Sequence, residues 1–78
     1  MALWPFEARL RLKTLSRNLR RLREQAGLTQ EQLAEKAGIT PRSLLFIEAA
    51  QFGASFAVFS RLRRALDCNW DTLLDGIE

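Results

Sequence analysis

The chain has 78 residues and a formal net charge of +3; 47% of the residues are hydrophobic and 27% charged, which indicates one small folded domain and excludes a disordered tail. A single cysteine, Cys68, excludes an intramolecular disulfide, and the lack of histidine excludes the usual zinc-ligand sets, so we expect neither metal nor cofactor. No apolar run approaches the roughly 18 residues of a membrane span and the N-terminus lacks the residue order of a signal peptide, so we expect a cytoplasmic protein.

Positive charge is concentrated at one end of the chain. Residues 1–23 contain seven basic and one acidic side chain, a net charge of +6, whereas the remaining 55 residues contain five basic and eight acidic side chains, a net charge of −3. Such a basic end is typical of an edge that faces a polyanion, and also of a solvated arginine-rich helix face. Charge alone leaves both interpretations open.

A stripe of apolar residues predicts the first helix, from about Leu15 to Ala26, before Gly27. The stripe has spacings of three and four and consists of Leu12, Leu15, Leu19, Leu22 and Ala26. Residues 9–13 also alternate with period two, so an edge strand, a helical extension and a loose arm all remain open there. We therefore treat residues 1–14 as an arm or extension and residues 15–76 as the domain.

The second helix is predicted over residues 30–37. Thr29 and Gln32 have the spacing of a capping box at its start, and Gly38 follows its end. Its apolar side is short and includes Ala34, a small residue that lets another helix approach closely.

The third helix is predicted from Pro41 to Glu48 or Ala49. Thr40 serves as its N-cap, and proline costs nothing at the first helical position because an amide there has no partner within the helix. Its inward edge consists of two residues three apart, Leu44 and Ile47.

The last two helices follow an uncharged connection. Ser55 caps a fourth helix whose apolar residues are spaced three or four apart, namely Phe56, Phe59, Leu62 and Leu66. A short last turn before Gly76 contains Trp70, Leu73 and Leu74. The sequence therefore predicts an all-α fold of five helices.

Two short helices joined by a tight turn form the geometry that places one helix across a DNA backbone and the next in the major groove. Residues 28–40 resemble the helix-turn-helix core of the phage repressor and Cro-type regulator family, the XRE-like small transcriptional regulators, and residues 55–74 resemble its last two helices. The resemblance implies a compact five-helix, lambda-repressor-like DNA-binding domain. It also implies a transcriptional regulator that binds a near-palindromic operator as a dimer. We expect no enzyme, because no nucleophile has a base to activate it.

The resemblance also implies which residues contact DNA. Base contacts are expected from Pro41, Arg42, Ser43 and Phe46. Phosphate contacts are expected from Thr29, Gln30, Arg23 and Gln51. Arg42 is the strongest candidate, since a guanidinium can bind O6 and N7 of a guanine. The alternatives are a phosphate contact or a surface charge for Arg42, and a merely exposed capping residue for Gln30.

The same resemblance implies an ion pair between Arg23 and Glu48 that orients the third helix against the first. The alternative is two separately solvated charges. The dimer interface is expected to involve Phe56, Cys68, Trp70 and Leu74, with the alternative that Trp70 belongs to the core.

The third helix and the loop after it depart from the family pattern. Relatives usually carry polar residues in place of Leu45 and Phe46, and a basic or amide residue plus glycine in place of Ala49-Ala50. Their following loop is normally rich in lysine, arginine or asparagine, whereas residues 51–53 of this chain, which include Phe52, carry no charge. Leu45, Phe46 and Phe52 could form an exposed patch that binds a protein, as in an antitoxin-like module. Two alternatives remain open: Phe46 contacts a thymine methyl group, or an N-terminal arm covers the patch with Leu3, Trp4 and Phe6.

Overall fold

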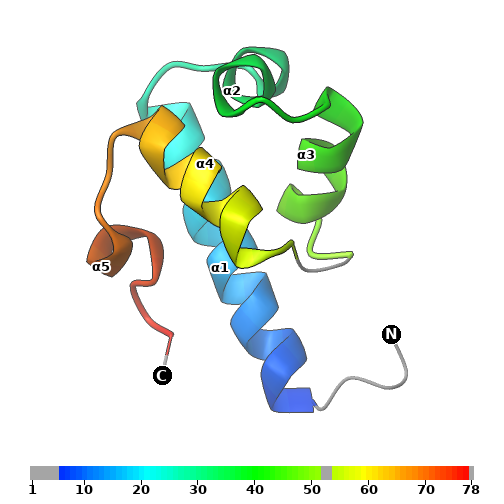
Figure 1. The fold of residues 1–78 in the computed structure, drawn as a ribbon. Helices are drawn as coiled ribbons and strands as arrows, with labels where there is room; N and C mark the ends of the chain where they lie inside the picture. Colours follow the sequence, from blue (N-terminus) through cyan, green and yellow to red (C-terminus); the bar gives the residue numbers. More distant parts are fainter. Residues whose placement is uncertain (1–5, 52–53, 78) are drawn as a thin grey trace.

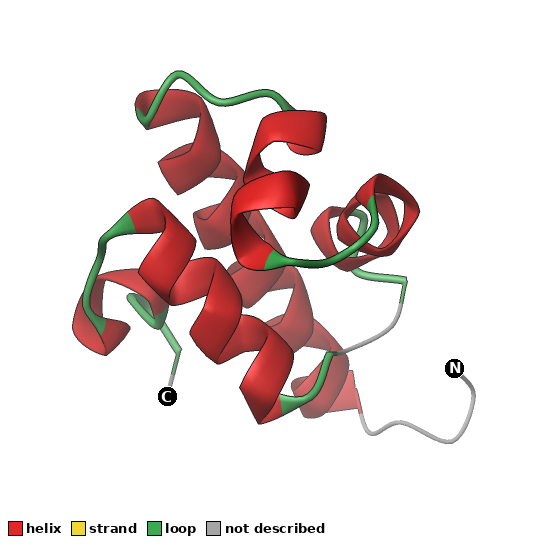
Figure 2. Ribbon diagram, turned by 45° about the horizontal axis from the view of Figure 1, so that its top comes forward, coloured by secondary structure: helices red, strands yellow, loops and turns green. Residues whose placement is uncertain are grey.

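A computed structural model describes residues 6–51 and 54–77. These residues form five helices and no strand: α1 (Phe6–Gln25), α2 (Gln30–Ala37), α3 (Pro41–Glu48), α4 (Phe56–Leu66) and α5 (Trp70–Leu73). Figure 1 shows α1 running the length of the molecule, with α2 and α3 on one side and α5 on the other. Figure 2 shows that the helices are joined by short loops. The five-helix, all-α prediction is confirmed.

Side chains that cap the helices explain where they start. The hydroxyl of Thr29 accepts a hydrogen bond from the amide of Gln32 at 3.0 Å, and the side chain of Gln32 accepts one from the amide of Thr29 at 2.8 Å. The predicted capping box is therefore present. Three further helices begin at an N-cap whose side chain accepts from the third residue beyond it, at Thr40, Ser55 and Asn69.

The first helix starts earlier than the predicted Leu15, since α1 already begins at Phe6. Of the three alternatives for residues 9–13, the structure contains the helical extension. The division between residues 14 and 15 therefore falls inside a continuous helix. The residues expected to cover the apolar patch, Leu3 and Trp4, lie outside the described residues, as does the side chain of Phe6.

The core takes at least one fully buried aliphatic side chain from every helix. These side chains belong to Leu19, Leu33, Leu44, Ile47, Leu62 and Leu73. Each contributes about 1.5 to 3 kcal/mol relative to remaining exposed. Among the four consecutive apolar residues of α3, only Leu44 and Ile47 are buried, as their spacing predicted.

Two buried polar side chains of α1 fix other helices to it. The hydroxyl of Ser16 donates to the carbonyl of Ile47 in α3 at 2.6 Å. The amide of Asn18 donates to the carbonyls of Leu73 and Asp75, at 2.9 and 2.7 Å, at the end of α5. Buried polar groups are costly unless they are hydrogen-bonded, so these three bonds hold α3 and the end of α5 in one position against α1.

The C-terminus of α3 has an unusual residue in a left-handed conformation. The amide of Ala50 donates to the carbonyl of Ile47 and that of Gln51 to the carbonyl of Phe46, both at 3.1 Å, which is the Schellman motif. The same motif ends α2 at Gly38, with φ at 73°. Ala50 adopts φ of 57° with a Cβ atom present, and this conformation is strained for any residue other than glycine.

Relief of that strain gives a testable expectation. Ala50→Gly should raise the free energy of unfolding by about 0.5 to 1 kcal/mol, because the strain removed exceeds the entropy that glycine adds to the unfolded chain. Ala49→Gly is the matched control, since Ala49 has φ of −82° and glycine brings it no relief. Thermal and urea melts measure both. Equal effects of the two substitutions would contradict the proposed strain.

Candidate nucleic-acid interface

The turn between α2 and α3 fixes how α3 is presented. Gly38 ends α2 in a left-handed conformation, and the amide of Ile39 donates to the carbonyl of Ala34 at 3.0 Å. Ile39 packs against the core, and Ala34 is fully buried, so the two helices meet closely. The N-terminus of α3 is consequently held at the surface, with Pro41 and Arg42 exposed.

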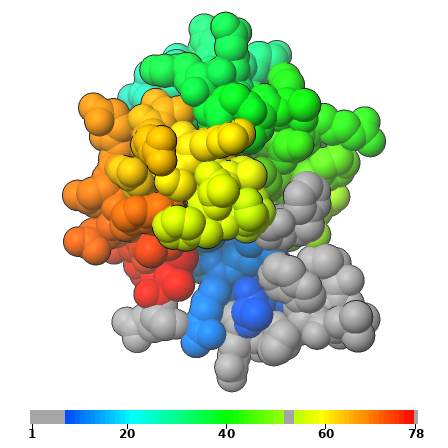
Figure 3. Space-filling view, in the orientation of Figure 1, coloured from blue at the N-terminus to red at the C-terminus, as the bar shows by residue number. Residues whose placement is uncertain are grey.

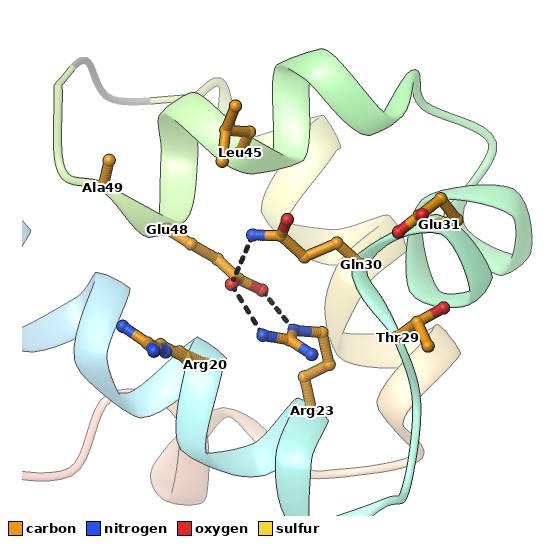
Figure 4. A pocket seen from close by; sticks show the side chains of 8 residues that line it. All are labelled: Arg20, Arg23, Thr29, Gln30, Glu31, Leu45, Glu48 and Ala49. Atoms are coloured by element: carbon orange, nitrogen blue, oxygen red, sulfur yellow. Dashed lines mark hydrogen bonds and ion pairs between the residues drawn. The ribbon is translucent and has the colours of Figure 1, made fainter.

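The carboxylate of Glu48 connects three helices. It accepts hydrogen bonds from Nε of Arg23 at 2.7 Å, Nη2 of Arg23 at 3.1 Å and Nε2 of Gln30 at 3.0 Å. Figure 4 shows Glu48 pointing from α3 toward Arg23 on α1, with Gln30 reaching it from the start of α2. The expected pairing of Arg23 with Glu48 is thus bidentate and has a third donor that the sequence did not indicate.

This ion pair is largely shielded from solvent. The side chains of Arg23 and Glu48 are only 12% and 4% exposed. The hydrogen bond to Glu48 raises the pKa of the Arg23 guanidinium despite the opposing effect of burial. Nη1 of Arg23 also donates to the carbonyl of Leu28 at 2.8 Å, which joins the end of α1 to the start of α2.

These bonds change how the expected phosphate contacts are interpreted. Arg23 uses three of its five N–H donors inside the protein, so it serves α3 before it serves any ligand. Gln30 gives one N–H to Glu48 and keeps the second. Thr29 and Gln51 are exposed. The donors that remain at the surface here therefore lie at the N-terminus of α2, on Thr29 and Gln30, and after α3, on Gln51.

Arg42 and Phe46 lie one turn apart on α3 and contact each other. The guanidinium carbon of Arg42 lies 5.3 Å from the centre of the Phe46 ring, a cation–π contact. Phe46 is half-buried and Arg42 exposed. Ser43, also expected to contact bases, is half-buried, and its hydroxyl accepts from the hydroxyl of Thr40 at 2.9 Å. Among the expected base-contacting residues, Arg42 thus has the most exposed polar group.

The expected apolar patch is only partly within the described residues. Leu45 is 50% exposed, and Phe46 is half-buried with the guanidinium of Arg42 over its ring. Phe52, its third member, lies outside the described residues.

Three of the four residues expected at a dimer interface meet on the other side of the molecule. The rings of Phe56 and Trp70 stack with centroids 5.1 Å apart, and Phe56 is 75% exposed. Both rings and Leu74 line an apolar hollow, together with Leu15, Ala54 and Phe59. Figure 3 shows α4, in yellow, beside α5, in orange. Trp70 is half-buried, which is intermediate between a core residue and an exposed interface residue, the two alternatives for it.

Cys68, the fourth of these residues, packs against the core instead. It does not line the hollow, and its thiol donates weakly to the carbonyl of Arg63 at 3.9 Å. Burial raises the pKa of this thiol, which favours its protonated form at neutral pH.

Comparison with known proteins identifies the family. The model of the helix-turn-helix family matches residues 19–73. The chain belongs to the helix-turn-helix family. It is 38% identical over 48 residues to an uncharacterised helix-turn-helix-type transcriptional regulator from Methanothermobacter thermautotrophicus, covering 62% of this chain and 70% of that protein. The resemblance to phage repressor and Cro-type regulators is thereby confirmed.

A solved structure shows the same fold as this helix-turn-helix protein. It is that of the restriction-modification controller protein C.AhdI from Aeromonas hydrophila, with a TM-score of 0.76 and 32% identity. The match covers 80% of this chain and 94% of the controller protein. Within residues 6–51 and 54–77, none of the helices has both the length and the apolar character needed to cross a membrane.

The pair on Glu48 can be tested by a double-mutant cycle. Arg23→Met and Glu48→Met should each lower the free energy of unfolding by about 2 to 4 kcal/mol, because each leaves a shielded charge unpaired. The double variant should lose less than the sum, with a coupling energy of at least about 1 kcal/mol in urea melts.

The exposed pair of Arg20 and Glu24 provides the control. Its atoms lie 3.5 Å apart and its side chains are 64% and 57% exposed. The same cycle there should give a coupling energy below about 0.5 kcal/mol. Coupling no larger at Arg23 and Glu48 would show that this pair does not fix α3.

Proposed function

We propose that this chain, a DNA-binding transcriptional regulator by its family, binds a near-palindromic operator as a dimer with one α3 in the major groove of each half-site. The observation that carries this is Arg42, which is exposed at the start of a helix that Glu48 ties to α1 and α2. The same family membership favours a regulator over an enzyme. Because its ligand is DNA, we place the protein in the cytoplasm.

Arg42 is the residue that selects bases in this proposal. The Phe46 ring lies against its guanidinium at 5.3 Å and limits the conformations that the side chain explores. The N–H groups at the guanidinium edge remain able to donate to O6 and N7 of one guanine. Pro41 and Phe46 then supply apolar contacts on either side, for example to a thymine methyl group, and Ser43 supplies a hydroxyl.

The N-terminus of α2 binds a phosphate in this arrangement. The unpaired amides of a first helical turn and the helix dipole favour an anion there. Thr29 adds a hydroxyl, and Gln30 adds the N–H that Glu48 does not use. Gln51 is exposed after α3 and contacts the neighbouring backbone. Arg23 contributes mainly by holding Glu48 and Gln30 in place.

The hollow between α4 and α5 is the proposed dimer surface. It is lined by apolar side chains, of which Phe56 and Leu74 are 75% and 40% exposed. A two-fold dimer would bury both copies of these side chains together and would place two α3 helices about one turn of DNA apart. Cys68 has no direct part in this surface.

A protein-binding role is the second candidate, favoured by the exposed Leu45. A protein partner would bind Leu45, Phe46 and the loop that contains Phe52. Arg42 already covers part of the Phe46 ring, which makes this surface less apolar than the sequence indicated. Leu45→Arg should abolish such a contact without changing DNA binding if this candidate is right.

Selection of bound sequences from random DNA tests the leading proposal. The wild-type chain should enrich a near-palindromic motif, and Arg42→Ala should lose preference at one base pair per half-site, worth about 1 to 3 kcal/mol. Gln30→Ala is the comparison and should weaken all sequences alike, since it removes a phosphate contact and one of the three hydrogen bonds to Glu48 but no group that contacts a base. Failure of the wild-type chain to enrich any motif at low salt would refute the proposal.

The dimer surface can be tested by mass in solution. Leu74→Arg should convert the dimer to a monomer in sedimentation experiments, because it places a charge in an apolar interface. Leu45→Arg is the matched control: it introduces the same change at a similarly exposed leucine on α3 and should leave the mass unchanged. A dimer that persists in Leu74→Arg would exclude the hollow as the interface.

A further inference from the structure

A stripe of basic residues runs along α1 and has no part in the function proposed so far. It consists of Arg9, Lys13, Arg17 and Arg20, all exposed. Their spacings of four, four and three place them on one side of the helix. They account for much of the positive charge of residues 1–23.

The stripe lies beside the end of α3 and the residues that follow it. Arg9 and Lys13 line a hollow together with Ala50 and Gln51. Farther along α1, Arg20 lines the hollow beside Glu48 (Figure 4). Two separate hollows therefore place this side of α1 next to the C-terminal end of α3, the helix proposed to enter the groove. Figure 1 shows the first turns of α1, in blue, extending past α3 and α4.

Carboxylates neutralise little of this charge. Arg20 lies 3.5 Å from Glu24 in a pair that is exposed and weak. Arg9, Lys13 and Arg17 form no ion pair within the described residues. The nearest acidic group of α3, Glu48, is already paired with Arg23. The stripe therefore presents positive charge that no structural role in the described protein accounts for.

The connection after α3 lacks the charge that the stripe supplies. Residues 49–54 contain no basic or acidic side chain. The helix-turn-helix family match begins at residue 19, after three of the four stripe residues. We propose that Arg9, Lys13 and Arg17 bind the phosphates of DNA that flank the half-site, in place of contacts from the connection. This inference rests on the proposed function, because it needs α3 in the major groove.

The stripe makes a quantitative prediction about salt. Each neutralised phosphate releases counterions and adds about 0.9 to the slope of log affinity against log salt concentration. Removing three contacts from each chain should therefore make this negative slope shallower by about 2.7 per chain. Between 50 and 200 mM salt, the affinity of the wild-type protein for DNA should accordingly fall by roughly 40-fold more per chain than the affinity of a variant without these three contacts.

The experiment compares two triple variants with equal net charge. R9Q/K13Q/R17Q, the stripe variant, removes the three stripe residues of the proposal and keeps Arg20, and R21Q/R61Q/R64Q removes three exposed charges elsewhere. Arg21 lines a hollow with Asp71 and Asp75 near α5, whereas Arg61 and Arg64 lie beside the end of α2. Glutamine is a good helix former, so both variants should fold, which circular dichroism and thermal melts verify. Fluorescence anisotropy on the selected operator and on a scrambled duplex measures affinity at several salt concentrations.

The expected result is a lower salt slope and weaker binding to both duplexes for the stripe variant, with the ratio between the duplexes preserved. The control variant should retain a slope close to that of the wild-type chain. Equal losses in the two variants would overturn the inference, since they would show only an effect of net charge. An unchanged slope in a stripe variant that still prefers the operator would also overturn it while leaving the proposed function standing. A wild-type chain without sequence preference would overturn both.

Discussion

The position of α3 depends on the carboxylate of Glu48. An acidic residue at the C-terminus of a helix opposes the helix dipole, so this carboxylate is unfavourable unless other groups neutralise it. Arg23 does so with two hydrogen bonds from α1, and the uncharged amide of Gln30 adds a third hydrogen bond from α2. Charge-assisted bonds in a shielded site are stronger and more directional than neutral ones. The same group that would destabilise α3 alone therefore fixes its angle to α1 and α2.

This arrangement separates residues that orient the interface from residues that can bind a ligand. Arg23 is bound to Glu48 and Leu28 and is nearly buried, so its charge acts within the protein. Arg42 is exposed, and its contact with Phe46 uses the face of the guanidinium rather than its N–H edge. Gln30 can serve both roles, because one N–H of its side-chain amide donates to Glu48 and the other is left for a ligand. A substitution at Arg23 should therefore affect every function of α3 at once.

The residue pattern itself predicted the features that depend on residues close together in the chain, whereas the pair of Arg23 and Glu48, 25 residues apart, was expected only from the family resemblance. The caps at Thr29 and Thr40 act over three residues, and the expected helices follow from them. The bonds of Ser16 and Asn18 span 31 and 55 residues, so only the packed fold brings their partners together. The sequence signal that Ser16 is buried was its position on the apolar side of the first helix, four residues after Leu12 and three before Leu19. The start of α1 was open for another reason: residues 9–13 fit periods of two and of 3.6 equally well.

After α3 the chain departs from the family pattern in two ways, the absence of a glycine at the end of the helix and the absence of charge in the connection. These two departures are physically related. Ala50 adopts a left-handed conformation that glycine would adopt with less strain, and the residues around it carry no charge. A connection that contacts phosphates needs donors and a backbone that approaches closely, and both favour glycine with polar neighbours. A connection relieved of that role can remain apolar and tolerate about 1 kcal/mol of local strain. The extended α1 beside it carries the missing charge on a rigid helix, where each basic group keeps a fixed spacing and loses less entropy on binding than it would on a loop.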